Sequence, residues 1–496
     1  MRRVWKLLLA PALVAGVLPL AMSGGSSVAA KCPSGKPPPL KFSKPTYIDK
    51  KRAGGEPVSI TAQDGSIIVS AHAGTTHLYK APDAAPGSQD FVDGYANQTL
   101  NWRSDDGGKT WKYVGLFGQE VGPHTATSTG FSDPDLTMDA SGRIYNVEID
   151  LANVAVFSSP DDGQSWPRGN PESASGDRPW VTGASKDEVY LYVNSPKQLW
   201  RSTDGGITWN IIGQGSGGAV SEAAGLAPVV PDGKLFVDPL SPKNGLIGPL
   251  GEGGAAFSKD GGKTWKAYPA MLGISTQFFG TIAVDRAGWV YAANAGGYSG
   301  SSDTVPNGEV TFNYFNRKTK KWAAKPVKID IPKGDAMWPW LIAGDNGRAA
   351  IVWYQTLPGS QEKFYAFAAY TTNAHGSYVK CSDGSRKFVP PQFSVANASG
   401  RPIHKGKICL GGTGCNASTN FEAGDRRLGD FFTVNFDHKG GIYIASGDTM
   451  LQSPTDGEKV VGNPIFIKQS RGAPLLKKPD KIRKTRPLAP PVPPQP

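Results

Sequence analysis

The chain is poor in the residues that usually build metal centres and thiol sites. It has 4 Cys and 6 His among 496 residues, and no Cys-x-x-Cys pair occurs. No nucleophile elbow, phosphate-binding loop or zinc-binding helix motif is present. His72 and His77 flank a short Gly-Thr-Thr stretch and are candidates for a ligand or metal contact, with a structural role as the favoured alternative. The sequence therefore predicts no metal site and no cofactor.

Long apolar runs are also missing after the first 30 residues, so no later segment is expected to cross a bilayer. The single apolar run, residues 7–22, follows a basic start and is interrupted by two prolines. The small residues Val28–Ala30 then fit a cleavage site. We interpret residues 1–30 as a signal peptide, removed after Ala30, and expect a secreted, extracellular protein.

A basic patch interleaved with aromatic residues is absent as well, so no nucleic-acid partner is expected. The net charge of +11 is concentrated towards the end of the chain, where a basic stretch precedes the proline-rich sequence PLAPPVPPQP. Residues 472–496 are predicted to be a disordered, basic, proline-rich tail. Two roles stay open for it, a solvated tail or a contact with an anionic cell-envelope surface.

One short phrase occurs four times in the first half of the chain. It reads SDDGGKTW at 104–111, SPDDGQSW at 159–166, STDGGITW at 202–209 and SKDGGKTW at 258–265. Asp and Gly at the centre favour the positive φ of a tight hairpin turn, and the hydroxyl groups can bond nearby backbone groups. The aspartates are thus predicted to hold turns, and the tryptophans to lie largely buried beneath them.

This phrase resembles the Asp box, or BNR repeat, of sialidases and related β-propellers. The resemblance covers roughly residues 50–470 and implies an all-β fold. It implies little about activity, because a fold does not fix a function.

A second, looser pattern occurs seven times. It consists of an opening residue, often before Pro, then an apolar strand, a Gly-containing turn and a second apolar strand. Examples begin at Glu56, Asp133 and Arg178. Paired with the hairpins of the Asp boxes, these units predict one all-β propeller of four-stranded blades over residues 51–471, with seven blades and six as the alternative. Residues 31–50 are taken as an N-terminal segment.

The four cysteines suit an oxidising compartment and allow three pairings. Cys409 and Cys415 are separated only by a glycine-rich run, so a disulfide between them is favoured. The pairing of Cys32 and Cys381 is left open.

The residues that open the seven inner strands should converge around the propeller axis. We call Glu56, Asp133, Arg178, Trp338 and Asp430 the ring residues. Glu56, Asp133 and Asp430 are the candidate catalytic carboxyl groups. The candidate ligand-binding residues are Arg178, Trp338, Trp340 and Arg427, since Arg binds carboxylates in a bidentate manner and Trp stacks on sugars. The alternative is that these charges pair with one another and join the blades.

The resemblance implies a Tyr nucleophile, an Asp acid/base and three Arg that bind the substrate carboxylate, as in sialidases. The chain departs from the family here, because it has Gly55-Glu56-Pro57 where the family has an Arg-Ile-Pro motif. The favoured hypothesis is a monomeric, secreted, sialidase-like propeller that binds an extracellular glycan or protein in its central funnel without the usual catalytic set. The alternative is an active exo-glycosidase of the exo-α-sialidase type.

Overall fold

The structure, a computed structural model, describes residues 31–72, 99–114, 131–150, 153–215, 228–251, 253–270, 272, 280–296, 309–331, 334–409, 424–453, 457–458 and 461–483. The predicted signal peptide and His77 lie outside these residues. The described residues form strands, turns and loops, and no helix is found among them. Nor does this part of the chain include a helix long and apolar enough to cross a bilayer.

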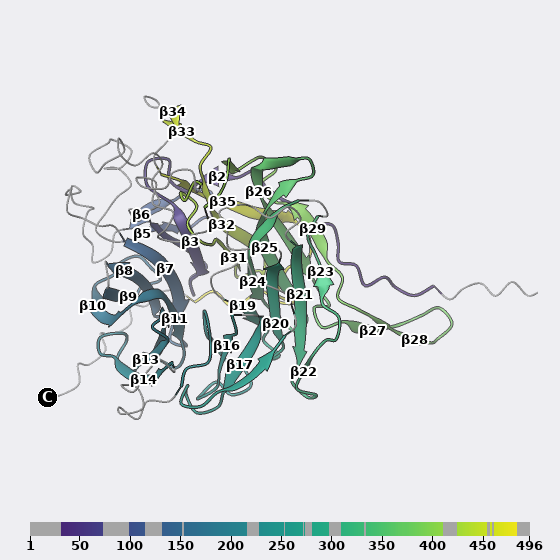
Figure 1. The fold of residues 1–496 in the computed structure, drawn as a ribbon, viewed down its shortest axis with the longest axis horizontal. Coiled ribbons are helices and arrows are strands. Elements are labelled where there is room, and N and C mark those ends of the chain that lie inside the picture. The colour runs from purple at the N-terminus through teal and green to yellow at the C-terminus, as the bar shows by residue number, and fades with distance from the viewer. Residues whose placement is uncertain are drawn as a thin grey trace, which may run out of the picture.

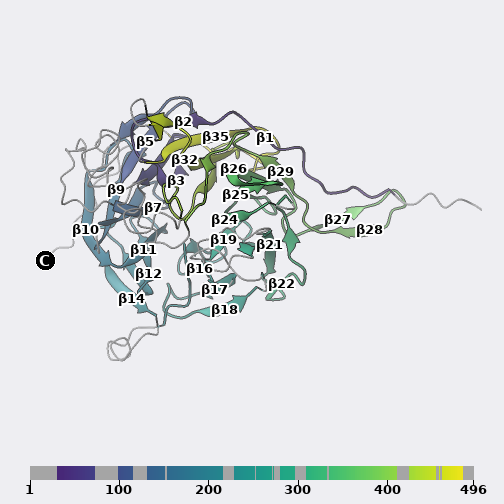
Figure 2. The same ribbon diagram turned by 45° about the horizontal axis from the view of Figure 1, so that its top comes forward.

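Seven small antiparallel sheets are arranged around a central axis as the blades of a propeller (Figures 1 and 2). Blade 1 contains β3 (Gly55–Thr61), β4 (Ile67–His72), β5 (Leu100–Ser104) and β6 (Lys112–Val114). Blade 2 contains β7 (Phe131–Met138), β8 (Ile144–Asp150), β9 (Asn153–Ser159) and β10 (Arg168–Ser175). Blade 3 contains β11 (Asp177–Gly183), β12 (Val189–Ser195), β13 (Gln198–Ser202) and β14 (Asn210–Gln214). Blade 4 contains β15 (Phe236–Val237), β16 (Leu246–Pro249), β17 (Gly254–Ser258) and β18 (Lys266–Pro269).

The remaining three blades carry additional short strands. Blade 5 contains β19 (Thr281–Val284), β20 (Val290–Gly296), β21 (Glu309–Asn316), β22 (Lys321–Trp322) and β23 (Val327–Lys328). Blade 6 contains β24 (Ala336–Ala343), β25 (Ala349–Leu357), β26 (Ser360–Thr371), β29 (Ser394–Asn397) and β30 (His404–Lys405). Blade 7 contains β31 (Thr433–Phe436), β32 (Ile442–Asp448) and β35 (Asn463–Arg471), with β1 (Lys41–Phe42) and β2 (Thr46–Tyr47). Two separate hairpins are β27 (Ser377–Lys380) with β28 (Arg386–Val389) and β33 (Gln452–Ser453) with β34 (Gly457–Glu458).

The seven predicted inner hairpins are confirmed, and with them the count of seven blades. Each copy of the second pattern supplies the first two strands of a blade, from β3 and β4 to β31 and β32. The first strands also approach one another between neighbouring blades, as β3 does with β7 and β31. The apolar residues of these strands face the adjacent sheets, which explains why a pattern of short apolar runs and Gly turns encodes this fold.

The N-terminal segment closes the ring, which the sequence analysis did not predict. β1 and β2 both pair antiparallel with β35, the strand nearest the C-terminus. Blade 7 is therefore built from both ends of the described chain, and the propeller begins before residue 51. The register shift between Lys41 and Phe42 and the short length of both strands gave no recognisable repeat.

Each Asp box is a turn held by its own side chains. In the first box the amide of Gly108 donates to Ser104 Oγ at 2.8 Å, and Ser104 Oγ donates to Asp106 at 2.8 Å. Asp106 also accepts from the amide and the hydroxyl of Thr110, at 2.9 and 2.6 Å. The same bonds recur in the other three boxes. The box aspartates therefore serve the turns, as predicted.

The packing of the boxes also explains why a glycine stands four residues after the opening Ser of each box. Gly108 has a φ of 91°, and a Cβ there would lie 2.1 Å from the ring of Phe466 in blade 7. Gly163 similarly approaches Ile68 of blade 1, and Gly262 approaches Leu199 of blade 3. Each of these box turns thus packs against the preceding blade, so the repeat joins neighbouring blades as well as closing a hairpin.

The prediction that all four box tryptophans are largely buried is correct only for Trp166, which is fully buried. Trp111, Trp209 and Trp265 are half-buried. Two of them donate from the indole N–H to their own turn, Trp209 to the Gly206 carbonyl at 3.1 Å and Trp265 to Gly262 at 3.0 Å. These side chains cover the turn from one side and leave the other side to solvent.

We expect Trp166→Ala to lower the free energy of unfolding by about 3–5 kcal/mol, because it removes a large, fully packed side chain. Trp265→Ala is the matched control, because Trp265 is only half-buried. It should lower the free energy of unfolding distinctly less. Chemical denaturation of both variants measures the difference. Equal losses would show that burial does not set the contribution of the box tryptophan.

The C-terminal segment differs from the predicted disordered tail. Residues 472–483 pack across the end of the propeller away from the ring residues, and Leu475 and Leu476 are fully buried. The amide of Leu475 donates to Gly440 at 2.7 Å, and Arg286 forms a bidentate ion pair with Asp480. The basic composition suggested solvation, but two adjacent leucines anchor the segment. Residues 484–496 lie outside the described part of the chain.

A disulfide joins Cys32 to Cys381, the pairing that the sequence left open. It ties the N-terminal segment to the β27–β28 hairpin, which projects from the propeller (Figures 1 and 2). Cys409 is disulfide-bonded as well. Its expected partner, Cys415, lies outside the described residues, so that pairing stays a prediction. A disulfide is compatible with an exported protein.

Candidate functional site

Four of the ring residues share an unusual backbone. Glu56, Asp133, Arg178 and Trp338 have φ angles of 48°, 58°, 58° and 52°, and each precedes a proline. A positive φ is uncommon for residues other than glycine, and a following proline further disfavours helical conformations. Residues held in such conformations store strain and concentrate at functional sites. The same costly arrangement therefore recurs at the start of the inner strand in four different blades.

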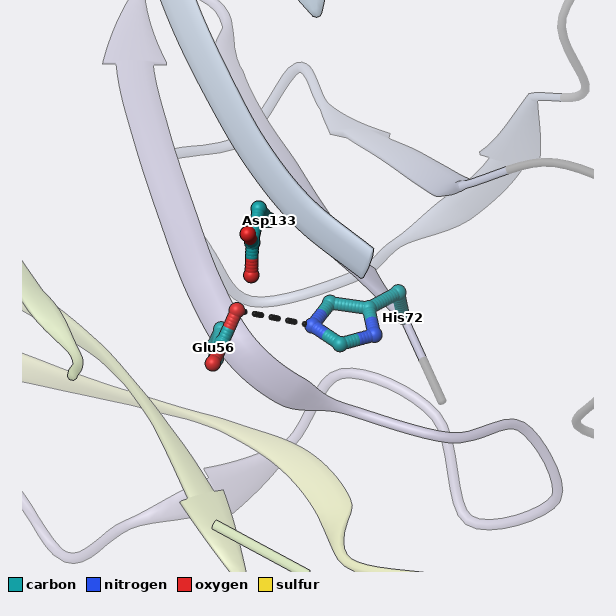
Figure 3. A group of neighbouring side chains, drawn as sticks. All are labelled: Glu56, His72 and Asp133. Atoms are coloured by element: carbon teal, nitrogen blue, oxygen red, sulfur yellow. Dashed lines mark hydrogen bonds and ion pairs between the residues drawn. The ribbon is translucent and has the colours of Figure 1, made fainter. Parts of the chain in front are cut away.

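Two of the strained residues, Glu56 and Asp133, lie at bulges that redirect their side chains. The pairing of β3 with β4 shifts register between Gly55 and Val58, and β7 with β8 shifts between Ser132 and Asp135. Such a bulge re-aims one side chain relative to the regular alternation of a strand. As a result Glu56 and Asp133, from adjacent blades, point towards each other (Figure 3).

Asp430 of blade 7 joins this group by a different device. It follows Gly429, which has a φ of 72° and lies so close to Glu56 that an added Cβ would be 2.1 Å from Glu56 Cγ. The amide of Asp430 donates to Glu56 Oε1 at 2.9 Å. Only glycine allows this approach. At the ring, the backbone of Gly429 therefore packs directly against the Glu56 side chain of blade 1.

A network of carboxyl groups and one histidine results. His72 Nε2 lies 3.0 Å from Glu56 Oε2, and Glu56 also contacts the Asp133 carboxyl group (Figure 3). Asp133 in turn contacts Asp177. Glu56 and His72 are at most 1% exposed and Asp133 is 6% exposed. The group is therefore removed from bulk water, where charge is expensive unless it is shared or neutralised.

Burial and mutual repulsion raise the pKa values of these acids. Desolvation raises the pKa of Asp133 to about 7, with a further contribution from the charge of Glu56. Desolvation, and then the charge of Asp430, raises the pKa of Glu56. Desolvation and the neighbouring Asp133 raise the pKa of Asp177 to about 6. At neutral pH the cluster therefore binds protons that isolated carboxyl groups would have released.

Two arginines supply the opposing charge. Arg426, which is 6% exposed, forms a bidentate ion pair with Asp430. The Arg178 guanidinium carbon lies 3.5 Å above the ring of Trp180 and 4.1 Å above that of Phe431. These cation–π contacts hold the Arg178 guanidinium beside the carboxyl groups.

Aromatic side chains close the centre of the propeller below the ring residues. Trp180 stacks on Trp340 at 5.5 Å, and Trp340 stacks on Phe431 at 5.6 Å. These side chains come from three different blades. Beyond them is a cavity of about 310 Å³, lined by the inner strands and by Trp340. Arg178 lies on the other side of the stack, so the stack separates the ring residues from this cavity.

The structure thus brings together Glu56, Asp133, Arg178 and Asp430 among the predicted site residues, but it places the others elsewhere. Trp338 is 2% exposed and packs against Tyr354 in the core, and Trp340 belongs to the aromatic stack. Neither is presented to a ligand on the ring side. Arg427 binds Asp425 through several hydrogen bonds, the shortest 2.6 Å long.

Three further residues belong to the site. Arg426 forms the ion pair with Asp430, whereas its neighbour Arg427 is the residue that the sequence analysis places in the site. Asp177 adjoins Arg178 in sequence and contacts Asp133, and neither it nor Arg426 is among the predicted site residues. His72, a candidate for a ligand or metal contact with a structural role as the favoured alternative, is brought to Glu56 by the pairing of Gly55 with His72 in the first hairpin.

The raised pKa values predict a pH dependence of stability. A carboxyl group whose pKa is higher in the folded than in the unfolded state stabilises the fold below its unfolded pKa, and this contribution is lost as the pH rises through the folded pKa. For Asp133 the window runs from about pH 4, the unfolded value, to about pH 7. The melting temperature in EDTA should fall across this window. Asp133→Asn should flatten the slope, and an unchanged slope would contradict the assignment.

Comparisons with known proteins identify no family. No protein-family model and no curated protein matches the chain. Among solved structures, an intramolecular trans-sialidase from Ruminococcus gnavus has 12% identity over 72% of this chain and 98% of its own, with a TM-score of 0.39. The GH74 enzyme of Niastella koreensis has 15% identity over 70% of this chain and 47% of its own, with a TM-score of 0.42. YCF48 bound to D1 peptide has 13% identity over 67% of this chain and 91% of its own, with a TM-score of 0.34. Such low scores carry no argument about ligand or activity.

Proposed function

We propose that the protein is a secreted, sialidase-like propeller that binds an extracellular glycan, free or on a glycoprotein, at the ring end of its central channel. One observation carries this proposal. Four blades hold non-glycine residues at positive φ where their inner strands begin, and three of these residues are charged and converge on the axis. Packing between blades alone does not require such strain, whereas a preorganised polar site does.

The chemistry of the cluster suits a polar, hydroxyl-rich ligand. Carboxyl groups accept hydrogen bonds from sugar hydroxyl groups, and the guanidinium groups of Arg178 and Arg426 donate them. The sialidase catalytic set is not proposed for this chain. Tyr354 and Tyr443 are fully buried, and their hydroxyl groups bond to Ser446 and Thr61. We also propose that the mature protein acts as a monomer, with residues 484–496 as the segment available to an anionic envelope surface.

An array of extracellular glycans, probed with the labelled mature protein, tests the proposal. We expect selective binding to a subset of glycans, and loss of that binding in Asp133→Asn. Binding that is equally strong for Asp133→Asn would place the glycan site outside the ring residues. An array without any bound glycan would contradict a glycan ligand and direct the search to a protein partner.

An exo-glycosidase is the second candidate, and the contact between Asp133 and Glu56 favours it. A carboxyl group with a pKa of about 7 beside a second acid meets the requirement for a general acid near neutral pH. Most glycosidases use two carboxyl groups about 5 Å or more apart, so Glu56, in contact with Asp133, would raise the pKa of the general acid and would not be its partner across the bond. A fluorogenic sialoside assay tests this candidate. Turnover that is lost in Asp133→Asn and declines above about pH 7 would support it, and no release of fluorophore from sialosides would contradict the exo-α-sialidase form of it.

A further inference from the structure

Three side chains that bind metal ions in other proteins meet at the ring. Glu56, His72 and Asp133 each offer one ligand atom, and these atoms all lie within 4.8 Å of one another (Figure 3). Of these atoms, His72 Nε2 and Glu56 Oε2 are 3.0 Å apart. Ligand atoms about 2.1 Å from an ion and at right angles to each other lie about 3 Å apart. The observed spacing therefore matches an edge of a coordination shell.

The backbone fixes all three positions. Gly55 pairs with His72 across β3 and β4, which places the imidazole next to the Glu56 side chain. Glu56 and Asp133 are directed inward by their left-handed backbone. Because every one of these side chains is buried, little reorganisation would accompany binding. Such prior ordering of the ligands is what a specific metal site requires.

The charges at the ring are unequal when all groups are ionised. Four carboxylates, those of Glu56, Asp133, Asp177 and Asp430, face the guanidinium groups of Arg178 and Arg426. Two negative charges are left over, which is costly in a buried setting. A divalent cation supplies the missing charge, and the contact between the Glu56 and Asp133 carboxyl groups marks the place where that charge is needed.

We propose that Glu56, His72 and Asp133 bind one divalent transition-metal ion between blades 1 and 2. The set combines one imidazole with two carboxyl groups, which suits Zn²⁺ or Mn²⁺ better than Ca²⁺ or Mg²⁺, whose protein ligands are oxygens. Metal ligands bind through unprotonated atoms, so the ion would take Nε2 of His72 and one carboxylate oxygen each from Glu56 and Asp133. Three protein ligands leave further coordination positions for an oxygen atom of a bound molecule.

This site goes beyond the proposed function, because metal binding does not depend on the identity of the extracellular ligand. It also changes the role of Asp133, since a carboxylate that coordinates a metal cannot act as the general acid of a glycosidase. The two roles are therefore separable by adding the metal. Saturating Zn²⁺ or Mn²⁺ should suppress any hydrolysis that depends on Asp133.

Isothermal titration calorimetry of the mature protein, stripped with chelator, tests the site with Zn²⁺, Mn²⁺ and Ca²⁺ in turn. We expect one equivalent of Zn²⁺ or Mn²⁺ to bind. Loss of an outer-shell partner alone weakens metal binding about 10–100-fold, so removing a ligand should weaken it more than about 100-fold. The ligand variants are His72→Gln, Glu56→Gln and Asp133→Asn.

His438→Gln is the matched control, because it removes a half-buried histidine at the opposite end of the propeller and should leave the affinity unchanged. Asp177→Asn is a second control that lowers the negative charge without removing a ligand, and it should have a smaller effect than Asp133→Asn. Substoichiometric binding, or His72→Gln with wild-type affinity, would overturn the proposal.

A measurement on the wild-type protein covers the case in which the variants fail to fold. Mn²⁺ bound at this site should show hyperfine coupling to one imidazole nitrogen in pulsed electron paramagnetic resonance. Bound Mn²⁺ without nitrogen coupling would exclude His72 as a ligand. If the metal binds and no glycan does, this inference stands and only the proposed function is contradicted. If a glycan binds and no metal does, the proposed function stands and this inference is overturned.

Discussion

Asp133→Asn should abolish ligand binding, or turnover if the protein is an enzyme, while leaving the melting temperature at pH 7 nearly unchanged. Asp133 lies at the centre of the carboxyl network, between Glu56 and Asp177. With a pKa of about 7, it is already partly protonated at neutral pH. An amide has nearly the same shape, and its NH2 group can donate to the neighbouring Glu56 or Asp177 as a protonated carboxyl group does, so folding loses little. Binding or catalysis that requires the carboxyl group loses its central contact.

Glu56→Gln and Asp430→Asn are expected to behave differently from each other. The pKa of Glu56 is raised, because the fold disfavours its ionised form. Gln is an uncharged replacement for this group. Asp430 neutralises Arg426, and Asn would leave that guanidinium buried without its partner. Loss of one member of a buried ion pair costs about 3–5 kcal/mol. Asp430→Asn should therefore destabilise the fold, and it is a poor reporter of ligand contact.

Asp260→Asn is the matched control for the Asp133 experiment, since it changes a box aspartate by the same chemistry. The Asp260 carboxylate accepts from Thr264 and Ser258 and holds its turn. We expect lower stability and unchanged ligand binding. Thermal melting and the glycan array, applied to both variants, separate the two roles. If Asp260→Asn lost binding and Asp133→Asn did not, the site would lie at the box turns and not at the axis.

The sequence predicted the parts of the fold that rest on local repeats. Seven inner hairpins were visible because each combines apolar strands with a Gly turn, and the box turns were visible because a few side chains bond their own backbone. The closure by β1 and β2 was not, since two-residue strands carry no periodicity. Leu475 and Leu476 were likewise overlooked in a segment whose composition is basic and proline-rich.

The sequence predicted the candidate site where a residue's place in the repeat determines the direction of its side chain. Glu56, Asp133 and Arg178 precede proline in equivalent units, and the ring geometry followed from that equivalence. Arg426 and Arg427 could not be distinguished, because the choice depends on the path of an irregular segment before β31. Apart from Tyr354, the side chains that bury Trp338 and stack on Trp340 belong to other blades. The local sequence pattern therefore gave no sign of the burial or of the stacking.

Truncation after Arg471 should destabilise the propeller strongly, although the removed residues look like a dispensable tail. Leu475 and Leu476 are fully buried, and burying a leucine contributes about 1.5–3 kcal/mol. Their loss therefore costs roughly 3–6 kcal/mol. Leu475 also bonds through its backbone to Gly440 of blade 7 and to Asp345 of blade 6. The segment thus joins neighbouring blades at the end opposite the ring.

Truncation after Arg483 is the control, because it removes only residues 484–496. It keeps the docked segment, residues 472–483, which packs against the propeller. We expect this shorter truncation to melt like the full mature chain, and the longer one to melt at a clearly lower temperature. Leu475→Ala should reproduce part of the loss, about 2–5 kcal/mol, by opening a cavity in the core. Because the docked segment lies away from the ring residues, ligand affinity below the melting transition should be unchanged in all three variants. Equal melting temperatures for the two truncations would show that residues 472–483 do not contribute to the stability of the propeller.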